Sequence, residues 1–306
     1  MTSRTARAPA KINLGLSIGA PRRDGFHDVA TAYHAVSLYD EVAASAADDL
    51  SVTVTSADGG AVAGVPQDAS NLAMAAALAL AEHAGVPAHA LLHVTKAIPV
   101  AGGMAGGSAD AAAALVACDD LWGTRVPRAQ LLEIAARLGS DVPFSLLGAT
   151  ALGSGRGEVL TPVLARGRFE WVVAVSDEGL STPEVYAECD RLRARRVLPE
   201  PRVPDQLLAA LRSGDPVELG AAMYNDLQDA ACSLRPSLRN TLAVGDDVGA
   251  LGSLVSGSGP SVVFLARDGE HALDIAVALT ATNVCSSVRR AHGPAHGARV
   301  VVDTDA

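Results

Sequence analysis

The stretch PVAGGMAGGSADAAAALVACDDLW, from Pro99 to Trp122, places four glycines within residues 102–107 and then continues as an alanine-rich run. Glycines let backbone N–H groups crowd around a ligand, and a helix that starts at such a loop adds the positive end of its dipole. The alternative interpretation is a tight turn between a strand and a close-packed helix. The glycine density, followed by Ser108, favours a phosphate-binding loop that opens a helix at Gly106 or Ser108.

Two common phosphate loops do not fit this stretch. A Walker A motif requires a lysine after its last glycine, whereas Ser108 follows Gly107 directly. The dinucleotide fingerprint G-x-G-x-x-G also fails, because Met104 or Ala105 stands where a glycine is required. The loop therefore belongs to another class. Asp110 lies in the first turn of the expected helix, where a carboxylate favours the helix dipole, and we expect only this helix-start role for it.

Two lysines and one aspartate could supply the groups for phosphoryl transfer. Lys11 and Lys96 are the only lysines among the 24 basic residues. Lys11 lies within the apolar segment KINLGLSI and is difficult to explain as a surface charge, whereas Lys96 fits a solvated strand end equally well. Asp141 in LGSDVPF is by itself typical of a turn or a helix cap. Beside a phosphate loop and a lysine, however, an aspartate can orient an attacking hydroxyl and accept its proton.

Composition excludes several broad classes of function. The formal net charge is -10, so no general basic field exists to gather nucleic acid or an anionic membrane surface. The four cysteines are far apart and form no C-x-x-C pair, which argues against a zinc site or a disulfide framework and predicts buried thiols. Aromatic residues make up only 3% of the chain, so we expect a core of closely packed Ala, Val and Leu.

No targeting or membrane-spanning segment is expected. Arginines precede INLGLSIGA near the start of the sequence, but Lys11 and Asn13 interrupt the apolar stretch and PRRDG follows it, unlike a signal peptide. Glu82, His83 or Asp110 likewise break the alanine-rich runs, so no apolar segment reaches the length that crosses a bilayer. We therefore expect a cytoplasmic protein with no membrane or nucleic-acid partner.

The pattern of apolar residues predicts an α+β chain that begins with a sheet-rich segment. Expected strands are 11–18, 33–45, 51–55, 89–100 and 169–176, with a glycine-punctuated hairpin over 148–163. Expected helices are 72–84, capped by Ser70 or Asn71, then 106–122, 128–138, 205–212, 216–231 and 237–245. SDVPF, residues 140–144, is expected to form a turn.

The second half of the chain has a less uniform composition. A charged, proline-rich stretch over residues 192–205 is the best candidate for an exposed linker or insertion. Residues 251–280 follow a strand–loop–strand–helix pattern, and a closing strand is expected near 297–303. The scattered residues His34, His83, His89 and His93 are interpreted as structural or solvated.

Six segments resemble the GHMP kinase superfamily, whose small-molecule kinases use a glycine–serine loop in place of a Walker A motif. The segments are PAKINLGLSI, RRDGFHD, IPVAGGMAGGSADAAAAL, LGSDVPF, ALGSGRGE and LVSGSGPSVVFL. They occur in the expected order and extend over nearly the whole chain, so together they are far more specific than any one of them. Within the superfamily the match is close to kinases of the non-mevalonate isoprenoid pathway that act on a cytidine diphosphate derivative of methylerythritol.

The resemblance implies a two-domain α+β GHMP kinase fold. An N-terminal ATP-binding domain, residues 1–165, would resemble domain 2 of ribosomal protein S5, and a ferredoxin-like C-terminal domain would comprise residues 166–306. The active site is expected in the cleft between them. Lys11 and Asp141 are then the catalytic pair: Asp141 takes the proton from the substrate hydroxyl, and Lys11 fixes and polarises both groups.

The same resemblance assigns the ligand-binding residues. ATP is the implied co-substrate, and Mg²⁺ is expected to be held mainly by the ATP phosphates and water, with Ser108 as a weak protein ligand. Residues expected to wrap the ATP phosphates are Pro99, Val100, Ala101, Gly102, Gly103, Met104, Ala105, Gly106, Gly107, Ser108 and Ala109. Residues expected to bind the small-molecule substrate are Asn13, Phe26, His27, Thr182, Tyr186, Gly257, Ser258 and Gly259.

Within the substrate set, Phe26 and Tyr186 are expected to enclose a cytosine while His27 hydrogen-bonds its edge. The alternative is that both aromatics belong to the core, which the scarcity of aromatics disfavours. Phe26 departs from the family pattern, since tyrosine is frequent there. Ala105 replaces a loop glycine and restricts the backbone. Gly107 stands where other GHMP kinases place a magnesium-binding serine, which leaves the protein ligands of the metal unassigned.

Two other functions remain open. A GHMP kinase for homoserine, mevalonate or galactose would not need the base-binding segments DGFHD and LSTPEVY, because those substrates carry no base. A non-catalytic nucleotide-binding regulator would not need Lys11 and Asp141. The oligomeric state also stays open between a monomer and a homodimer.

Overall fold

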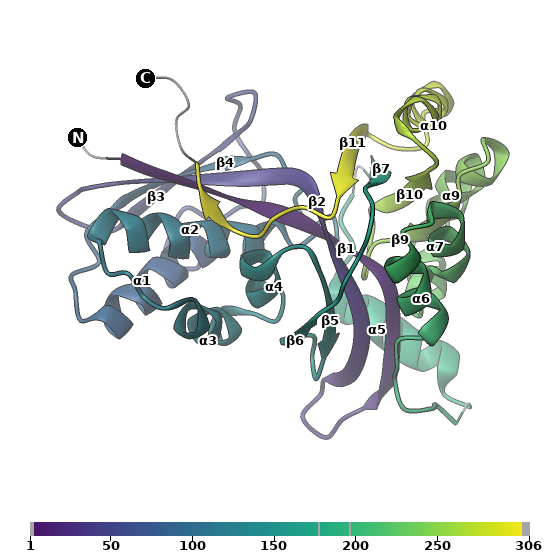
Figure 1. The fold of residues 1–306 in the computed structure, drawn as a ribbon, viewed down its shortest axis with the longest axis horizontal. Coiled ribbons are helices and arrows are strands. Elements are labelled where there is room, and N and C mark those ends of the chain that lie inside the picture. The colour runs from purple at the N-terminus through teal and green to yellow at the C-terminus, as the bar shows by residue number, and fades with distance from the viewer. Residues whose placement is uncertain (1–2, 177, 196, 302–306) are drawn as a thin grey trace.

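The computed structural model describes residues 3–176, 178–195 and 197–301, which form two sheets with helices packed around them (Figure 1). The main path of the first sheet has the spatial order β12 (Arg299–Val300), β1 (Ser3–Pro21), β2 (His27–Ser45), β4 (Leu91–Lys96) and β3 (Ser51–Ser56). Off this path, β5 (Thr150–Ser154) pairs with β2 and with β6 (Val159–Pro162), and β8 (Tyr224–Asn225) pairs with β1. The second sheet has the order β11 (Ser287–Gly293), β7 (Phe169–Val175), β10 (Val262–Ala266) and β9 (Gly252–Val255).

The strands β1 and β2 form a long antiparallel hairpin that positions much of the site. Their pairing runs from Ser3 opposite Ser45 to Pro21 opposite His27 and is interrupted by bulges. Residues 8–16 of β1 are all buried, so both faces of this strand are covered and its nearly continuous run of small and apolar residues fits that environment. The strands expected over 11–18 and 33–45 are confirmed as parts of this hairpin. The strand expected over 51–55 is confirmed as β3.

Three helices contact the first sheet, namely α1 (Leu72–Ala84), α2 (Gly106–Trp122) and α4 (Val142–Leu147), and α3 (Arg128–Leu138) packs on these helices (Figure 1). Six alanines of α2 are fully buried, and their small side chains let the helix approach β1 and β2 closely. Helices α1, α2 and α3 are confirmed at their expected bounds, with Asn71 as the cap of α1. The turn expected over 140–144 is wrong, because Pro143 is compatible with a first helical turn and the chain enters α4 there.

The helices of the second half surround the second sheet: α5 (Thr182–Arg193), α6 (Asp205–Ser213), α7 (Pro216–Ala222), α8 (Gln228–Leu234), α9 (Ser237–Asp247) and α10 (Gly269–Thr282) (Figure 1). The single helix expected over 216–231 is wrong, because β8 interrupts it. Asn225 in β8 donates hydrogen bonds to the carbonyls of Val255 (2.7 Å) and Gly257 (2.8 Å), which holds this segment extended. Neither α5 nor β11 was expected from the sequence.

We call the part built on the eight-stranded sheet the first lobe and the part built on the four-stranded sheet the second lobe. The expected domain boundary at 165/166 falls in the loop between β6 and β7. The chain later returns to the first lobe through β8 and β12, both of which pair with β1. The expected closing strand over 297–303 is reduced to β12, and its last two positions lie outside the described residues. The described part of 192–205 is mostly exposed and joins α5 to α6 within the second lobe.

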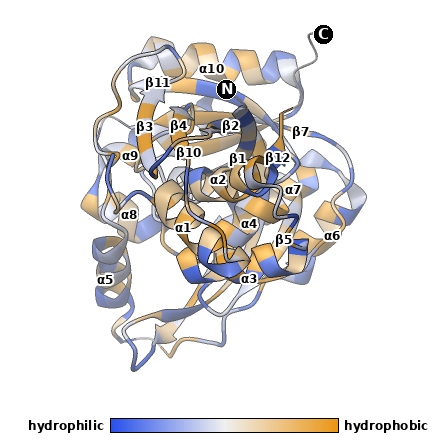
Figure 2. Ribbon diagram, turned by 90° about the vertical axis from the view of Figure 1, so that its left-hand side faces the viewer, coloured by the Kyte–Doolittle hydropathy of each residue, from blue (hydrophilic) through white to orange (hydrophobic). Residues whose placement is uncertain are grey.

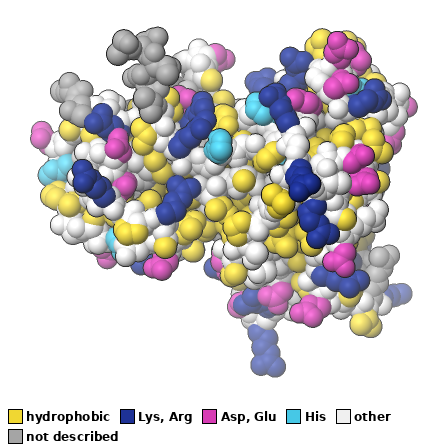
Figure 3. All heavy atoms as spheres, viewed as in Figure 1, with side chains coloured by type: hydrophobic (Ala, Val, Ile, Leu, Met, Phe, Trp, Pro, Cys, Tyr) yellow, Lys and Arg dark blue, Asp and Glu magenta, His cyan; other side chains and the backbone are white. Residues whose placement is uncertain are grey.

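Hydrophobic residues concentrate on the central strands and on α1 and α2, whereas α5 is mostly hydrophilic (Figure 2). On the face shown in Figure 3, Lys and Arg side chains are scattered over both lobes among acidic and apolar ones. Three of the four cysteines are buried and Cys285 is half-buried. Within the described ranges, no helix combines the length and apolar character needed to cross a membrane.

A buried ion cluster supports the strand that leads into the glycine loop. Lys96 is 5% exposed and its Nζ contacts Asp40 Oδ2 (2.5 Å) and Asp110 Oδ2 (2.7 Å). Asp40 Oδ1 also accepts from the backbone N–H groups of Ala97 (2.7 Å) and Ile98 (2.8 Å). Lys96 is therefore not the solvated strand end that the sequence left open, and Asp110 does more than start a helix.

The two carboxylates of this cluster share a single ammonium. Burial and the charge of Asp40 raise the pKa of Asp110 to about 7, against the opposing effect of Lys96. Burial alone would lower the pKa of Lys96, but the two carboxylates raise it. Asp110 Oδ1 has no hydrogen-bond partner among the described residues, so Asp110 is the weakly held member of the cluster and Asp40 the firmly held one.

The two lobes meet where residues 256–261 pack against the glycine loop. Gly103 has a φ of +72°, and a Cβ there would overlap the carbonyl oxygen of Ser256 and lie 2.9 Å from that of Gly259. Ser256 Oγ donates to the carbonyl of Gly103 (3.3 Å). Glycine at this position therefore permits both the left-handed backbone and the close approach of the second lobe.

The ion cluster predicts that the isosteric substitutions Asp110→Asn and Asp40→Asn have opposite effects on stability. Asp110→Asn removes the unshared negative charge, whereas Asp40→Asn places an amide N–H₂ against the Lys96 ammonium or turns its oxygen away from Ala97 and Ile98. The pKa of Asp110 is about 7 in the folded protein and about 4 in the unfolded chain. The free energy of unfolding therefore falls as the pH rises between these two values. We expect wild type to lose stability relative to Asp110→Asn between pH 5 and pH 8.

Urea unfolding of the three proteins at pH 5 and pH 8 checks this prediction. Asp40→Asn should lose about 2 kcal/mol at pH 5, since a buried donor is left unpaired, and less at pH 8, because the charge that raises the Asp110 pKa is also removed. Equal losses for Asp40→Asn and Asp110→Asn, independent of pH, would contradict the unequal roles that we assign to the two carboxylates.

Gly103→Ala should destabilise the protein more than Gly59→Ala, which is a matched control. Gly59 has a φ of +83° with no atom within 4 Å of an added Cβ, so alanine there incurs only the left-handed backbone term of about 1 kcal/mol. Alanine at Gly103 incurs that term and a steric overlap, about 3 kcal/mol in total. Urea unfolding measures both free energies, and equal losses would mean that the lobes are not in close contact at Gly103.

Candidate active site

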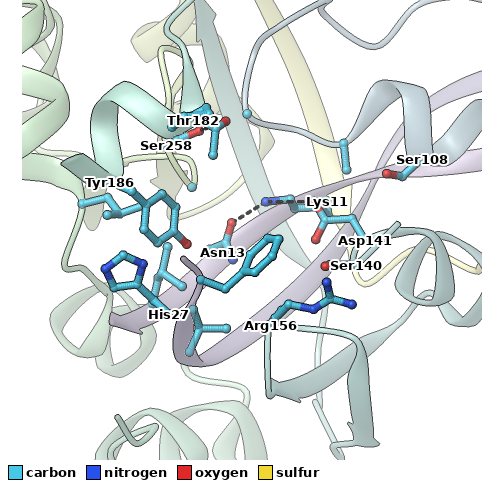
Figure 4. A pocket seen from close by; sticks show the side chains of 18 of the residues that line it. Lys11, Asn13, His27, Ser108, Ser140, Asp141, Arg156, Thr182, Tyr186 and Ser258 are labelled. Atoms are coloured by element: carbon cyan, nitrogen blue, oxygen red, sulfur yellow. Dashed lines mark hydrogen bonds and ion pairs between the residues drawn. The ribbon is translucent and has the colours of Figure 1, made fainter. Parts of the chain in front are cut away.

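A cavity of about 660 Å³ lies where the β1–β2 hairpin, α5, the glycine loop and residues 257–258 meet (Figure 4). It brings together side chains and backbone from segments that are far apart in the sequence and from both lobes. The residues named from the sequence that line it are Lys11, Asn13, Phe26, His27, Gly103, Ala105, Ser108, Asp141, Thr182, Tyr186, Gly257 and Ser258.

Lys11 projects from β1 into this cavity and is held by a chain of hydrogen bonds (Figure 4). Its Nζ donates to Asn13 Oδ1 (2.7 Å), and Asn13 Nδ2 donates to Thr31 Oγ1 (2.7 Å). Thr31 Oγ1 donates in turn to the carbonyl of Gly15 (2.8 Å). This sequence of donors and acceptors keeps the Asn13 oxygen facing the ammonium. The backbone N–H of Lys11 donates to the carbonyl of Met104 (3.2 Å), which ties β1 to the glycine loop.

Asp141 faces Lys11 from the residue before α4. Its Oδ2 lies 3.9 Å from Lys11 Nζ, and its Oδ1 accepts from the Tyr33 hydroxyl (3.0 Å). Within the described chain its side chain makes no cap bond to α4, so the carboxylate remains available to the cavity. Burial and the neighbouring Asp141 charge raise the pKa of Tyr33 well above its usual range. The Tyr33 hydroxyl therefore remains a donor that fixes one carboxylate oxygen.

The glycine loop separates the first cavity from a second one of about 370 Å³. Gly103 and Ala105 border both cavities. The loop residues that border only the second cavity are Pro99, Val100, Ala101, Gly102, Gly106 and Gly107. Met104 and Ala109 are fully buried. Neither of these two residues nor Gly259 is among the described residues that line the two cavities.

Two alanines of the loop adopt left-handed backbone conformations. The φ angles are +53° at Ala101 and +60° at Ala105, a region that disfavours residues with a Cβ by about 1–2 kcal/mol. Ala105 is the N-cap residue of α2, directly before Gly106. The departure at Ala105 noted in the sequence therefore falls on a position whose backbone suits glycine better, and the loop keeps this shape against the preference of its own residues.

The far end of the cavity is lined by rings. His27 Nε2 donates to Asp190 Oδ1 (2.9 Å), and the centroids of the His27 and Tyr186 rings are 5.0 Å apart. Burial raises the pKa of Tyr186 to about 12, so its ring stays neutral. Phe26 is 51% exposed and the Arg156 guanidinium lies 5.1 Å from its ring centroid. An aromatic side chain that is half exposed at a cavity is not a core residue.

The second lobe contributes a small polar cluster to the cavity. Thr182 Oγ1 and Ser258 Oγ share a hydrogen bond of 2.9 Å, and both groups face the cavity (Figure 4). The carbonyl of Gly257 accepts from Asn225 Nδ2 (2.8 Å), and a Cβ on Gly257 would lie 3.2 Å from Lys11 Nζ. The lack of a side chain at Gly257 therefore keeps space open beside the ammonium.

Four polar residues that line the cavity were not expected from the sequence: Tyr33, Ser140, Arg156 and Asp190. Two of them carried a detectable signal. Tyr33 lies opposite Asn13 in the β1–β2 register, and Asp190 follows Tyr186 by four residues on α5, so both face the same side of that helix. Arg156 lies in the segment ALGSGRGE, which contributed to the resemblance without an assigned role.

The remaining histidines lie outside this constellation. His34 shares a hydrogen bond with Thr150 Oγ1 (2.8 Å), and complete burial lowers its pKa to about 3, so it is a neutral structural residue. His93 contacts the hydroxyls of Thr53 and Thr55. Over the described ranges, no group of three or more His, Cys, Asp and Glu side chains is arranged to hold a metal ion.

The geometry is suited to transfer of a group to a hydroxyl. An oxygen placed between Lys11 Nζ and Asp141 Oδ2 would be within hydrogen-bond reach of both, because those atoms are 3.9 Å apart. The loop at Gly103–Ser108 borders the same space and offers backbone N–H groups at the start of α2. A fixed ammonium, an available carboxylate and the glycine loop therefore meet in one cavity.

Comparison with known proteins supports this assignment. The model of the GHMP kinase N-terminal domain matches residues 71–149, and that of the GHMP kinase C-terminal domain matches residues 207–285. The chain is 57% identical over 296 residues to the 4-diphosphocytidyl-2-C-methyl-D-erythritol kinase of Salinispora tropica, which covers 96% of this chain and 93% of that protein. It is 55% identical over 305 residues to the protein of the same name from Thermobifida fusca, which covers 98% and 99%.

Solved structures show the same relation. A crystal structure of 4-(cytidine 5'-diphospho)-2C-methyl-D-erythritol kinase matches with a TM-score of 0.76 and 32% identity, covering 95% of this chain and 98% of that one. Homoserine kinase from Cytophaga hutchinsonii matches with a TM-score of 0.75 at 19% identity and shares the fold. The expected two-domain α+β fold is thus confirmed. The chain belongs to the GHMP kinases, in the family of the 4-diphosphocytidyl-2-C-methyl-D-erythritol kinases, and is a small-molecule kinase.

Proposed function

We propose that the enzyme transfers the γ-phosphoryl group of ATP to the C2 hydroxyl of 4-diphosphocytidyl-2-C-methyl-D-erythritol, with Lys11 and Asp141 as the catalytic pair. The observation that carries the proposal is their position. The 3.9 Å gap between Lys11 Nζ and Asp141 Oδ2 lies in a cavity that the glycine loop and the rings of His27 and Tyr186 also line. A long substrate with a base at one end and a hydroxyl at the other fits such a cavity.

Asp141 is the proposed general base. Its Oδ1 is held by the Tyr33 hydroxyl (3.0 Å), which leaves Oδ2 to accept the proton as the substrate oxygen attacks phosphorus. Lys11 stabilises the negative charge that develops on that oxygen and on the transferred phosphoryl group. The hydrogen bond from Lys11 Nζ to Asn13 Oδ1 (2.7 Å) keeps the ammonium aimed at this point. The residues thereby position the reactants before the reaction begins.

The glycine loop is the proposed cradle for the ATP phosphates. Its backbone N–H groups and the start of α2 provide positive partial charge without a net positive side chain. Backbone groups and the Ser108 hydroxyl border the loop, Lys96 and Asp110 border the second cavity, and within the described residues no group of three or more His, Cys, Asp and Glu side chains is arranged to hold a metal ion. This donor set is compatible with Mg²⁺ that arrives bound mainly to the nucleotide, with Ser108 as a weak protein ligand. The ion would neutralise phosphate charge during transfer.

The far end of the cavity is the proposed cytosine site. Phe26 and Tyr186 offer ring faces for stacking, and His27 is held in one orientation by Asp190. This end favours a cytidyl substrate over homoserine, mevalonate or galactose, because a substrate without a base would leave these rings unused. The hydroxyls of Thr182 and Ser258 lie between the base end and the glycine loop and are proposed to contact the substrate.

The first test of the chemistry is the substitution Asp141→Asn. It keeps the size of the side chain and removes the basic oxygen, so we expect turnover to fall by about 10²–10⁴-fold while an ATP analogue still binds with nearly wild-type affinity. Asp120→Asn is the control, since Asp120 is exposed and pairs with Arg4 far from the cavity. ADP release and calorimetric titration provide the two measurements. Unchanged turnover in Asp141→Asn would remove Asp141 as the base.

Substrate choice is tested with a coupled ADP-release assay. Wild type should prefer 4-diphosphocytidyl-2-C-methyl-D-erythritol to homoserine, mevalonate and galactose in kcat/KM. Tyr186→Ala should raise the KM for the cytidyl substrate about tenfold or more with little change in kcat, because base–aromatic stacking contributes about 1–3 kcal/mol to binding. Equal or better use of a substrate without a base would reject the cytosine site.

A further inference from the structure

We propose that Arg156 binds the diphosphate that joins the two ends of the substrate. This inference rests on the proposed function and assigns a residue to the middle of the same cavity. Arg156 lies in the turn between β5 and β6, in the segment ALGSGRGE. Nothing in the hydroxyl-activating pair or in the base-binding rings accounts for its presence in the cavity lining.

The charge balance of the cavity requires a cation at this point. The substrate diphosphate carries negative charge, and the cavity lining already includes the carboxylates of Asp141 and Asp190. Among the described residues that line the cavity, the only Lys and Arg side chains are Lys11 and Arg156. Lys11 is committed to Asn13 and Asp141, and its side chain is only 8% exposed. In a chain of net charge -10, the diphosphate needs local compensation.

The guanidinium of Arg156 is available for this role. Its side chain is 41% exposed, and its closest carboxylate contact is a loose one, 3.7 Å from Nε to Glu158 Oε1. Within the described residues, its guanidinium makes no hydrogen bond. A guanidinium presents a planar fork of N–H donors that matches phosphate oxygens. The terminal nitrogens are therefore free to bind an anion in the cavity.

The position of Arg156 agrees with the order of groups in the substrate. Its guanidinium lies 5.1 Å from the ring centroid of Phe26, at the base end. In Figure 4 the Arg156 side chain extends from the β5–β6 turn towards Ser140 and Asp141, at the hydroxyl end of the cavity. His27 and Tyr186 lie on the other side of it. A diphosphate between cytidine and the phosphate acceptor would therefore pass beside Arg156.

Calorimetric titration with cytidine and with cytidine 5'-diphosphate tests this proposal without requiring catalysis. Wild type should bind the diphosphate more tightly than the nucleoside. In Arg156→Gln this preference should fall about tenfold, as expected for loss of a charge-assisted hydrogen bond, while cytidine affinity changes little. Arg156→Lys should keep part of the preference, because it retains the charge but not the fork.

Arg22→Gln is the matched control. Arg22 is exposed, pairs with Asp24 and Asp28, and is not among the residues that line the cavity, so its substitution removes the same charge without removing the contact. A preference that is equally reduced in Arg22→Gln, or unchanged in Arg156→Gln, overturns the assignment of Arg156. Failure of wild type to bind either ligand overturns the cytosine site and the proposed function with it.

Steady-state kinetics separates the substrate diphosphate from the ATP phosphates. Arg156→Gln should raise the KM for the cytidyl substrate about tenfold and leave the KM for ATP within twofold of wild type. A rise in the KM for ATP with no change in the KM for the cytidyl substrate would place Arg156 on the nucleotide and overturn the inference, even if the enzyme phosphorylates the cytidyl substrate as proposed.

Discussion

The buried ammonium of Lys11 is the constraint on which the site depends. It projects from a strand whose residues 8–16 are all buried, and a charge taken from water is costly unless it is paired and hydrogen-bonded. Asn13 provides the bonded oxygen and Asp141 the opposite charge. Asn13 and Asp141, which offset the cost of burying the Lys11 ammonium, are thus also the residues proposed to position and activate the acceptor hydroxyl. One hydrogen-bond network therefore serves both stability and the proposed chemistry.

The other lysine of the chain, Lys96, is also buried, but it borders the second cavity and not the first. Lys96 contacts the carboxylates of Asp40 and Asp110, all three residues being at most 5% exposed. These carboxylates occupy two of its donors, and Asp40 also anchors the backbone at Ala97 and Ile98. Lys96 therefore fixes the strand end that leads into the glycine loop, whereas Lys11 faces the first cavity.

Sequence reasoning located the parts of the site better than the connections between them. The glycine loop, Lys11 and Asp141 carry local signals, and the Asn71 cap of α1 and the alanine-rich run of α2 are read directly from neighbouring residues. The break between α7 and α8 could not be foreseen, because it depends on hydrogen bonds from Asn225 to β9 and Gly257. Arg156 was missed for the same reason: only the folded chain places it beside Phe26.

A chain with an excess of negative charge binds polyanions only if positive potential is concentrated where the phosphates lie. Backbone dipoles achieve this at the glycine loop, but they act only if the loop keeps its shape. Ala101 and Ala105 adopt backbone angles that alanine disfavours, so the loop residues by themselves do not favour this conformation. Gly103 rests against Ser256 and Gly259 of the second lobe, and the carbonyl of Met104 is bound by the Lys11 N–H of the first. Contacts from both lobes thus maintain the loop geometry, which makes the junction between the lobes part of the proposed phosphate site.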